Sequence, residues 1–252
     1  MNAARPRRQR GLTAATIFTV LGVAILFGLG NWQLERMVWK EALIETTTAR
    51  LAAAPENLPP PAQWSNLDRD QYEFRRVMFP AELLNGKDAF VYTSGSAFRP
   101  DVSGPGYWVF TPARLPGGSM IVVNRGFVPL DRKDAGSRPQ GALTGLVDFT
   151  GVMRWPEARR PFTPDDEPQN NVWHRRDPRA IAAAKDWGAV APFYVEQERP
   201  QSPGGLPQAG QLAVKLPNNH LQYAITWFGL AAALAGVYLA WLIARQRLRR
   251  RR

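Results

Sequence analysis

Two long uncharged apolar segments, one near each end of the chain, limit its possible folds more than any other feature. The first covers residues 12–30 and the second covers residues 221–244. As helices rising roughly 1.5 Å per residue, they would span about 28 Å and about 36 Å, against a bilayer hydrocarbon core of about 30 Å. Both segments therefore predict transmembrane helices. The longer one must tilt or leave its first turn in the headgroup region.

Basic residues flank both segments. Residues 1–11 contain four arginines, and residues 245–252 contain six. Because basic flanks favour the cytoplasmic side, both termini are expected in the cytoplasm and residues 31–220 on the other side of the membrane. These tails account for most of the net charge of +11, since the remaining 22 Lys and Arg nearly balance the 21 Asp and Glu. The charge thus predicts contact with anionic membrane lipid and no nucleic-acid partner.

The first apolar segment is interpreted as a retained anchor rather than a cleaved signal peptide. It is longer than the apolar region of a signal peptide, usually about 7–15 residues, and no small-residue cleavage site precedes residues 32–36. The basic tail before it is also short for an organellar transit peptide. These features favour a bacterial inner (plasma) membrane, with residues 31–220 in the periplasm.

The stretch between the membrane segments is long enough for one domain with its own core. Apolar residues at helical spacing over 31–53 predict that the first helix continues until the prolines at 55 and 59–61. Short runs rich in Val, Phe, Tyr and Trp then predict strands at residues 72–79, 89–94, 107–111, 120–128, 146–153 and 193–195. Residues 156–173 and 199–211 are expected to be irregular loops.

One helix is expected among the strands. Asp177 can cap it, Pro178 suits its first position, residues 180–187 continue it and Gly188 ends it. The predicted fold class is therefore membrane α plus β. Two transmembrane helices flank one mainly antiparallel β domain, a barrel or a sandwich, which contains one or two helices.

The sequence lacks the parts of the common enzyme classes. It has no cysteine, which excludes disulfides, thiolate catalysis and Cys-based metal sites, and it has no GxSxG, HExxH, P-loop or dinucleotide-binding pattern. The acidic run Asp165-Asp166-Glu167 lies near His174, but its proline-rich surroundings favour a solvated loop over a metal site. The protein is therefore not expected to be an enzyme.

Arg125 lies where a strong predicted strand gives way to the sequence Asn124-Arg125-Gly126-Phe127. Gly126 in this position predicts a β-bulge or a close approach of another backbone segment. Arg125 then has two open interpretations. It either pairs with a carboxylate inside the domain or binds an anionic group such as a propionate.

His220 stands at the start of the second apolar segment and has two open interpretations as well. On a helix it shares a face with Tyr223, Ala224 and Trp227. In the first interpretation Asn219 caps the helix, and the histidine and aromatic rings form an ordinary interfacial belt. In the second, the neutral imidazole binds haem iron while Tyr223 and Trp227 pack against the macrocycle.

Three separated motifs resemble the Surfeit locus protein 1 family, the assembly factors of haem-copper terminal oxidases. They are residues 29–36 (LGNWQLER) followed by Trp39-Lys40, residues 123–129 (VNRGFVP), and residues 218–230 (NNHLQYAITWFGL). They occur in the expected order between two membrane segments, so the resemblance is specific and covers about residues 29–230. Phe127 departs from the family pattern, which often has tryptophan there.

The resemblance implies a non-enzymatic bacterial factor that helps haem a reach subunit I of cytochrome c oxidase. It also implies that the histidine of the Asn-Asn-His motif, His220 here, is a haem a axial ligand, which meets iron only as part of the haem. The implied partners are subunit I and the haem a synthesis machinery. The alternative is a cofactor-free membrane scaffold that stabilises nascent subunit I.

Overall fold

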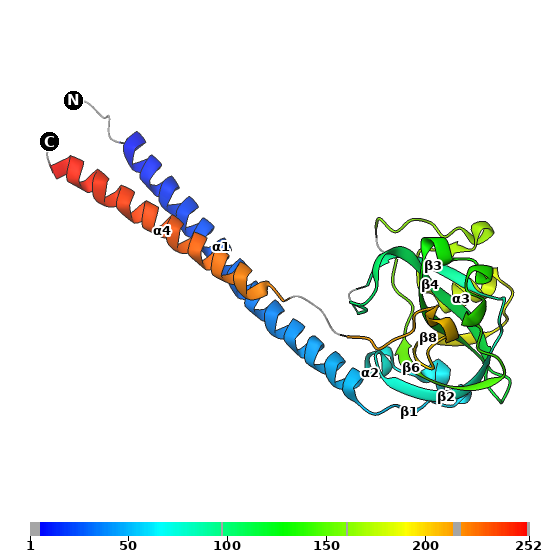
Figure 1. Cartoon of the computed structure of the whole chain (residues 1–252). Coiled ribbons are helices and arrows are strands. Elements are labelled where there is room, and N and C mark those ends of the chain that lie inside the picture. Colours follow the sequence, from blue (N-terminus) through cyan, green and yellow to red (C-terminus); the bar gives the residue numbers. More distant parts are fainter. Residues whose placement is uncertain (1–5, 97, 160, 214–217, 251–252) are drawn as a thin grey trace. The chain divides into compact units, whose positions relative to one another are not determined.

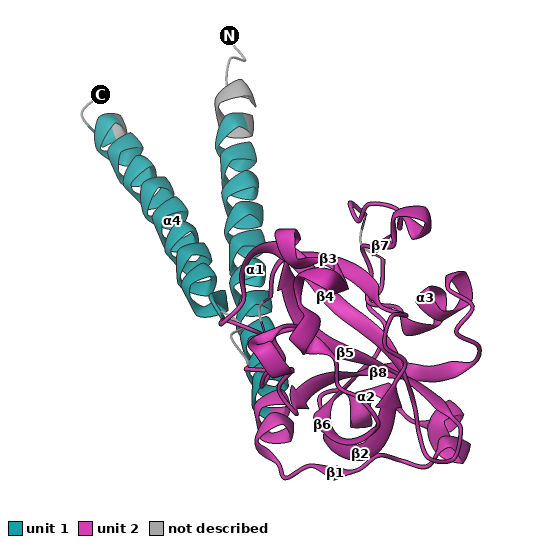
Figure 2. Cartoon of the chain, turned by 45° about the vertical axis from the view of Figure 1, so that its right-hand side comes forward, with its two compact units in different colours: residues 1–45, 217–252 teal, residues 46–216 magenta. Residues whose placement is uncertain are grey.

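A computed structural model describes residues 6–96, 98–159, 161–213 and 218–250. The chain divides into two compact units (Figure 2). The first unit, residues 1–45 and 217–252, contains most of one long helix and all of another. The second unit, residues 46–216, contains the β-strands and the short helices.

The two long helices are α1 (Pro6–Ala52) and α4 (His220–Arg250). Within their unit they run antiparallel, so the start of α1 and the end of α4 lie at the same side (Figure 1). Helix α1 continues without interruption past the predicted span, as the sequence indicated. Among the described residues, Gly11–Ala52 and His220–Leu248 are long and apolar enough to cross a membrane. Their most apolar windows are almost entirely exposed, which is unlike the core helix of a water-soluble protein.

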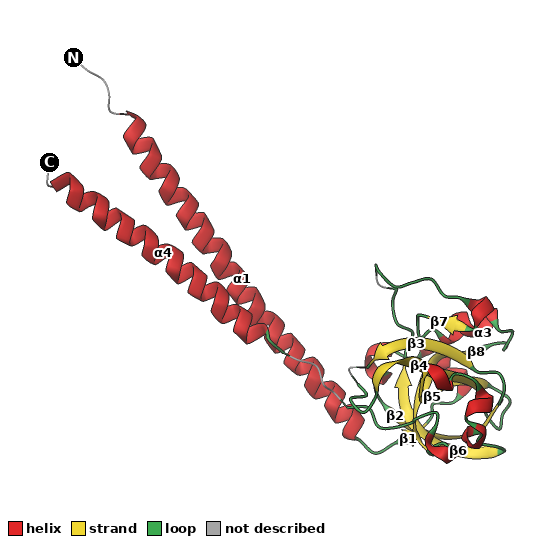
Figure 3. Ribbon diagram, turned by 45° about the horizontal axis from the view of Figure 1, so that its top comes forward, coloured by secondary structure: helices red, strands yellow, loops and turns green. Residues whose placement is uncertain are grey.

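The described residues of the β domain form eight strands, and Figure 3 shows the strands in yellow. Their bounds are β1 (Glu56–Asn57), β2 (Arg76–Leu83), β3 (Ala89–Gly95), β4 (Ser103–Arg114), β5 (Met120–Pro129), β6 (Leu146–Arg154), β7 (Val172–Trp173) and β8 (Val190–Arg199). Two short α-helices accompany them, α2 (Arg69–Tyr72) and α3 (Pro178–Ala184). Short 3-10 helices cover Pro61–Asn66, Leu130–Arg132, Ala135–Ser137, Pro139–Gly141, Pro168–Asn170 and Pro203–Gly205.

The sheet closes into a barrel. Its strand order is β1-β2-β6-β8-β5-β4-β3-β7, and β2 also pairs with β4 through Glu82 and Leu83. Strands β2, β6, β8, β5 and β4 therefore form a ring. The pairing is mainly antiparallel, but β5–β8, β1–β2 and β3–β7 are parallel. Of the two predicted forms, barrel and sandwich, the structure is a barrel.

The barrel core follows from the period of two along its strands. In β2, Val77, Phe79, Ala81 and Leu83 are buried, while the residues between them are exposed. They join a cluster with side chains from the other barrel strands, including Ile121, Phe149 and Phe193. A second cluster contains Trp108, Phe110, Tyr194 and, from α3, Ile181 and Ala182.

Several predicted boundaries differ from the observed ones. The strand predicted at residues 72–79 begins at Arg76, because Asp68 accepts a hydrogen bond from the Asp70 amide and starts helix α2 there. Helix α3 has the predicted cap, with Asp177 accepting from two amides, but it ends at Ala184 instead of residue 187. The loop predicted at 156–173 includes the end strand β7, which pairs with β3.

Candidate functional site

His220 is the first residue of α4, and its ring contacts α1. The imidazole Nδ1 lies 2.6 Å from Oε1 of Gln33, and His220 and Gln33 are both half-buried. Among the described residues, no group forms a hydrogen bond with the other ring nitrogen, Nε2. The preceding Asn219 accepts a backbone hydrogen bond from Tyr223, which fits the N-cap position that the sequence indicated.

Small residues bring the two helices close beside His220. A Cβ added at Gly30 would lie 2.5 Å from Cε1 of Phe228, so any larger residue there would clash with this ring. Phe228 also packs edge-on against Phe27, with ring centroids 5.2 Å apart. Ala224 is buried one turn after His220. The start of α4 is therefore held against α1 by steric fit.

Tyr223 and Trp227 lie near His220 along α4 but differ in exposure. Tyr223 is 54% exposed, and Trp227 is half-buried. Tyr223 thus lies at the surface of the helix pair and Trp227 is partly covered, while His220 contacts α1 and Ala224 is buried. The arrangement offers one ring nitrogen with aromatic surface nearby, which suits either a membrane interface or a planar hydrophobic ligand.

Arg125 lies in the β domain and points into it. Its side chain is only 2% exposed, its Nη2 donates to the carbonyl of Gly141, and its Nε is buried without a partner among the described residues. Burial lowers the pKa of its guanidinium, although Asp88 acts in the opposite direction. No described carboxylate forms an ion pair with it within 4.0 Å, so neither the predicted internal pair nor an accessible anion-binding group is observed.

Gly126 confirms the predicted bulge and close approach. Trp108 pairs with Phe127 and Phe110 pairs with Asn124, so Arg125 and Gly126 together oppose a single residue of β4. Gly126 has φ +119°, and an added Cβ would lie 2.1 Å from the carbonyl oxygen of Gln208. Phe127 and Gln208 exchange two backbone hydrogen bonds at this point. The glycine is required because another segment of backbone passes directly over it.

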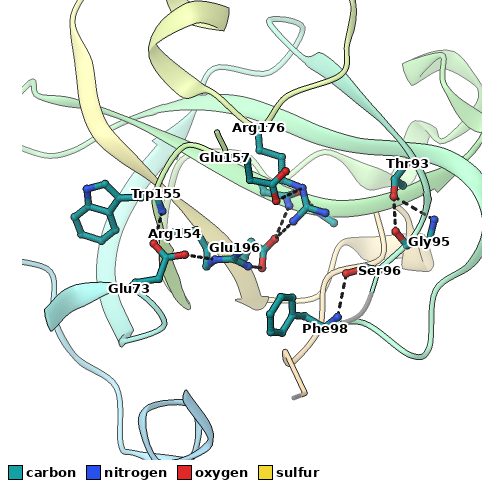
Figure 4. Close-up of polar contacts among 12 residues, drawn as sticks. Glu73, Thr93, Gly95, Ser96, Phe98, Arg154, Trp155, Glu157, Arg176 and Glu196 are labelled. Carbon is teal, nitrogen blue, oxygen red and sulfur yellow. Dashed lines mark hydrogen bonds and ion pairs between the residues drawn. The ribbon is translucent and has the colours of Figure 1, made fainter. Parts of the chain in front are cut away.

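A buried network of ion pairs crosses the β domain, and sequence reasoning missed it (Figure 4). Arg154 donates to Glu73 at 2.9 Å and to Glu196 at 3.3 Å. Arg176 donates to the other oxygen of Glu196 at 3.0 Å and lies 3.8 Å from Glu157. None of these charged residues belongs to a recognisable sequence motif. Only the fold brings them together.

Aromatic rings enclose the network. The Arg154 guanidinium lies 4.4 Å from the centroid of Phe74 and 5.2 Å from that of Phe98, and Arg176 lies over Trp108. Burial opposes the charge of Arg154, but the carboxylates of Glu196 and Glu73 outweigh it and raise its pKa above the ordinary value. Burial also opposes the charge of Arg176, but Glu196 and Glu157 raise its pKa above the ordinary value. Both guanidinium groups are therefore charged and paired with buried carboxylates, which indicates a structural role.

Tyr194 lies beside this network with its hydroxyl buried and without a hydrogen-bond partner among the described residues. Burial raises the pKa of its phenol above the ordinary 10.0. Above pH 10 an unfolded tyrosine ionises while Tyr194 in the folded domain resists, so folded stability is lost as pH rises. The expected slope is up to about 1.4 kcal/mol per pH unit.

We therefore expect Tyr194→Phe to raise the free energy of unfolding at pH 8 by between 0 and about 1 kcal/mol, because it removes an unsatisfied buried hydroxyl. Its advantage should grow at pH 10.5. Thermal unfolding of the full chain in detergent measures both effects. Tyr92→Phe, at an exposed tyrosine, is the matched control and should not alter the pH dependence. A lower midpoint for Tyr194→Phe at both pH values would contradict the expectation.

The acidic run that follows residue 164 is engaged with basic side chains. Asp165 pairs with Arg159 at 2.6 Å, and Asp166 pairs with Arg175 at 3.0 Å and accepts from the backbone of His174. Among the residues that the structure describes, no three His, Asp or Glu side chains are grouped as metal ligands.

The fold defines a class of protein: a β-barrel domain between two long apolar helices that are suited to a membrane. The SURF1 family profile matches residues 20–232. Surfeit locus protein 1 of Mus musculus is 35% identical over 91% of this chain and 80% of its own length, and that of Takifugu rubripes is 34% identical over 88% and 95%. The Homo sapiens protein is 35% identical over 82% of this chain and 70% of its own. The chain belongs to the SURF1 family, which confirms the resemblance seen in its motifs.

Proposed function

We propose that this protein assists the assembly of cytochrome c oxidase by holding haem a at His220 and passing it to subunit I. The general role in oxidase assembly follows from family membership. The specific role rests on one observation: the imidazole at the start of α4 has its Nδ1 engaged by Gln33 and its Nε2 without a described partner. The proposal involves no catalytic step.

The side chains around His220 are of the types that bind haem. The iron of a bound haem accepts a neutral imidazole nitrogen as an axial ligand, and its macrocycle needs apolar contact. His220 provides the nitrogen, while Tyr223 and Trp227 provide the aromatic surface. A single imidazole also suits a carrier, because one bond is more readily exchanged than two. The proposal does not depend on Arg125, whose side chain is buried inside the β domain.

The proposed setting is the bacterial inner membrane, with both basic tails in the cytoplasm and the β domain in the periplasm. The two apolar helices support insertion in a membrane. In this setting His220 would lie at the periplasmic boundary of the bilayer, because it is the first residue of α4. The proposed partners are subunit I, which receives the haem, and the haem a synthesis machinery, which supplies it.

His220→Ala tests the proposed ligand. We expect the purified wild-type protein to carry a haem absorption spectrum and the variant to lose at least nine-tenths of its intensity, because the iron loses its nitrogen ligand. His174→Ala is the matched control, since His174 is the other histidine of the chain and lies in the β domain. Unchanged circular dichroism shows that the variants fold. Full haem content in His220→Ala would overturn the ligand assignment.

The alternative function, a scaffold without cofactor, differs in one observable. A haem carrier should associate with subunit I more weakly when cells make no haem a, whereas a scaffold should associate equally well. Co-purification of the two proteins from cells with and without haem a synthesis measures the difference. Equal recovery from both would favour the scaffold.

A further inference from the structure

We propose that Gln33 is a positioning residue for His220, which holds the imidazole in the tautomer with its proton on Nδ1. This inference rests on the proposed function, because it concerns how the histidine is prepared for a metal ligand. Gln33 belongs to α1 and His220 to α4, so the pair joins the two helices of one unit. Sequence reasoning had no means of finding this contact, since 187 positions separate the two residues.

The short contact indicates that Nδ1 carries a proton. Oε1 of Gln33 lies 2.6 Å from Nδ1, and an amide oxygen can only accept a hydrogen bond. The Nδ1 atom must therefore donate. A neutral imidazole has one N–H, so Nε2 is left with a lone pair. No described residue hydrogen-bonds to Nε2, and in the proposed role this lone pair binds the metal.

The packing of the helices holds Gln33 opposite His220. Gly30 lies one turn before Gln33 and fits against Phe228, as described above. Met37 lies one turn after Gln33, and its carbonyl accepts a hydrogen bond from Asn218 Nδ2 at 3.4 Å. These contacts on either side of the pair fix the rotation and the register of the helices. The Cα atoms of Gln33 and His220 are therefore held where the two side chains can meet.

A partner on the second ring nitrogen has known consequences for a metal-ligating histidine. It fixes the plane of the ring and increases the basicity of the ligating nitrogen, and its loss costs about 10- to 100-fold in metal affinity. The Gln33 amide is neutral, so its effect on basicity is weaker than that of a carboxylate. Its main contribution is the choice of tautomer and the direction of the Nε2 lone pair.

The tautomer is measurable in the full chain without any haem. The chain contains only two histidines, so nitrogen NMR of ¹⁵N-histidine-labelled protein in detergent gives two ring spectra, which His174→Ala assigns. We expect the wild-type His220 to be protonated on Nδ1. Gln33→Leu should move the proton mainly to Nε2, because the acceptor is gone. Gln33→Glu retains an acceptor and should keep the proton on Nδ1.

Haemin titration of the same proteins gives the second readout. We expect Gln33→Leu to bind haemin 10- to 100-fold more weakly than the wild type, and Gln33→Glu to bind it at least as well. Gln222→Leu is the matched control, since Gln222 is an exposed residue of α4, and it should change neither the tautomer nor the affinity.

The role of Gln33 and the role of His220 as haem ligand are tested by different outcomes. A wild-type His220 protonated on Nε2, or an unchanged tautomer in Gln33→Leu, would overturn the role of Gln33. So would an unchanged haemin affinity in Gln33→Leu when His220→Ala does lose binding. Unchanged affinity in His220→Ala would instead overturn the proposed haem ligand, and the NMR result on the Gln33–His220 pair would be unaffected.

Discussion

Replacing Arg154 with methionine is expected to destabilise the β domain by about 3–5 kcal/mol, because removing one partner of a buried ion pair leaves the other charge buried and uncompensated. Arg154 bridges Glu73 and Glu196, and all three side chains are largely buried. Its loss also removes the cation from between the rings of Phe74 and Phe98. The methionine fills much of the same volume, so the effect reports charge rather than a cavity.

Thermal unfolding of the full chain in detergent, followed by circular dichroism in the β region, measures this effect. A loss of this size corresponds to a fall in the midpoint of roughly 10 °C for a domain of this length. Arg159→Met is the matched control, since Arg159 forms a short ion pair with Asp165 at the exposed surface. Surface pairs contribute about 0–1 kcal/mol, so the control should move the midpoint little. Equal shifts for the two variants would contradict the assignment of a buried structural network.

Replacing Gly126 with alanine is expected to cost at least about 3 kcal/mol, from backbone strain and steric overlap together. Its φ of +119° is open to glycine and strained for other residues, and the new Cβ would lie 2.1 Å from the Gln208 carbonyl oxygen. To relieve the overlap, the Gln208 segment must move away and lose its two hydrogen bonds to Phe127. The variant thus separates this segment from strand β5.

Gly117→Ala is the control for Gly126→Ala, because nothing lies within 4 Å of a Cβ at Gly117. We expect this control to unfold within about 0.5 kcal/mol of the wild type, as substitutions at exposed sites usually do. Limited proteolysis adds a local readout, since the Gln208 segment should become sensitive to cleavage only in Gly126→Ala. Resistance of that segment in the variant, with an unchanged midpoint, would show that the close approach is not required.

The residues whose structural role could be predicted from sequence are those that act on the segment in which they lie. Lack of charge over residues 12–30 and 221–244 determines two apolar helices whatever else the chain does, because a helix satisfies its own backbone hydrogen bonds. Asp177 and Pro178 act on the helix that they begin, and Gly126 marks its own bulge. The predicted boundaries that differ from the structure also have a local cause. The start of β2 was misplaced because α2 depends on a cap at Asp68 that lies outside the apolar run.

The candidate site was predictable only in part. His220 could be recognised from its motif and from its position at the edge of an apolar segment, and the structure places it at the first residue of α4. Its partner could not be recognised, because Gln33 is one of several polar residues near the end of the first span. Arg125 was singled out by its place in the strand, but its burial against Gly141 depends on a turn 16 residues away.

The amino-acid order was therefore enough for the anchors, the β class and the family, since each depends on patterns within one short segment. The closed barrel, the Arg154–Glu196–Arg176 network and the Gln33–His220 pair all required the folded chain. In each of these, groups far apart in sequence come within hydrogen-bond distance, and their pairing depends on strand register and helix rotation. Those quantities result from the packing of the whole domain or helix pair, so no single segment encodes them.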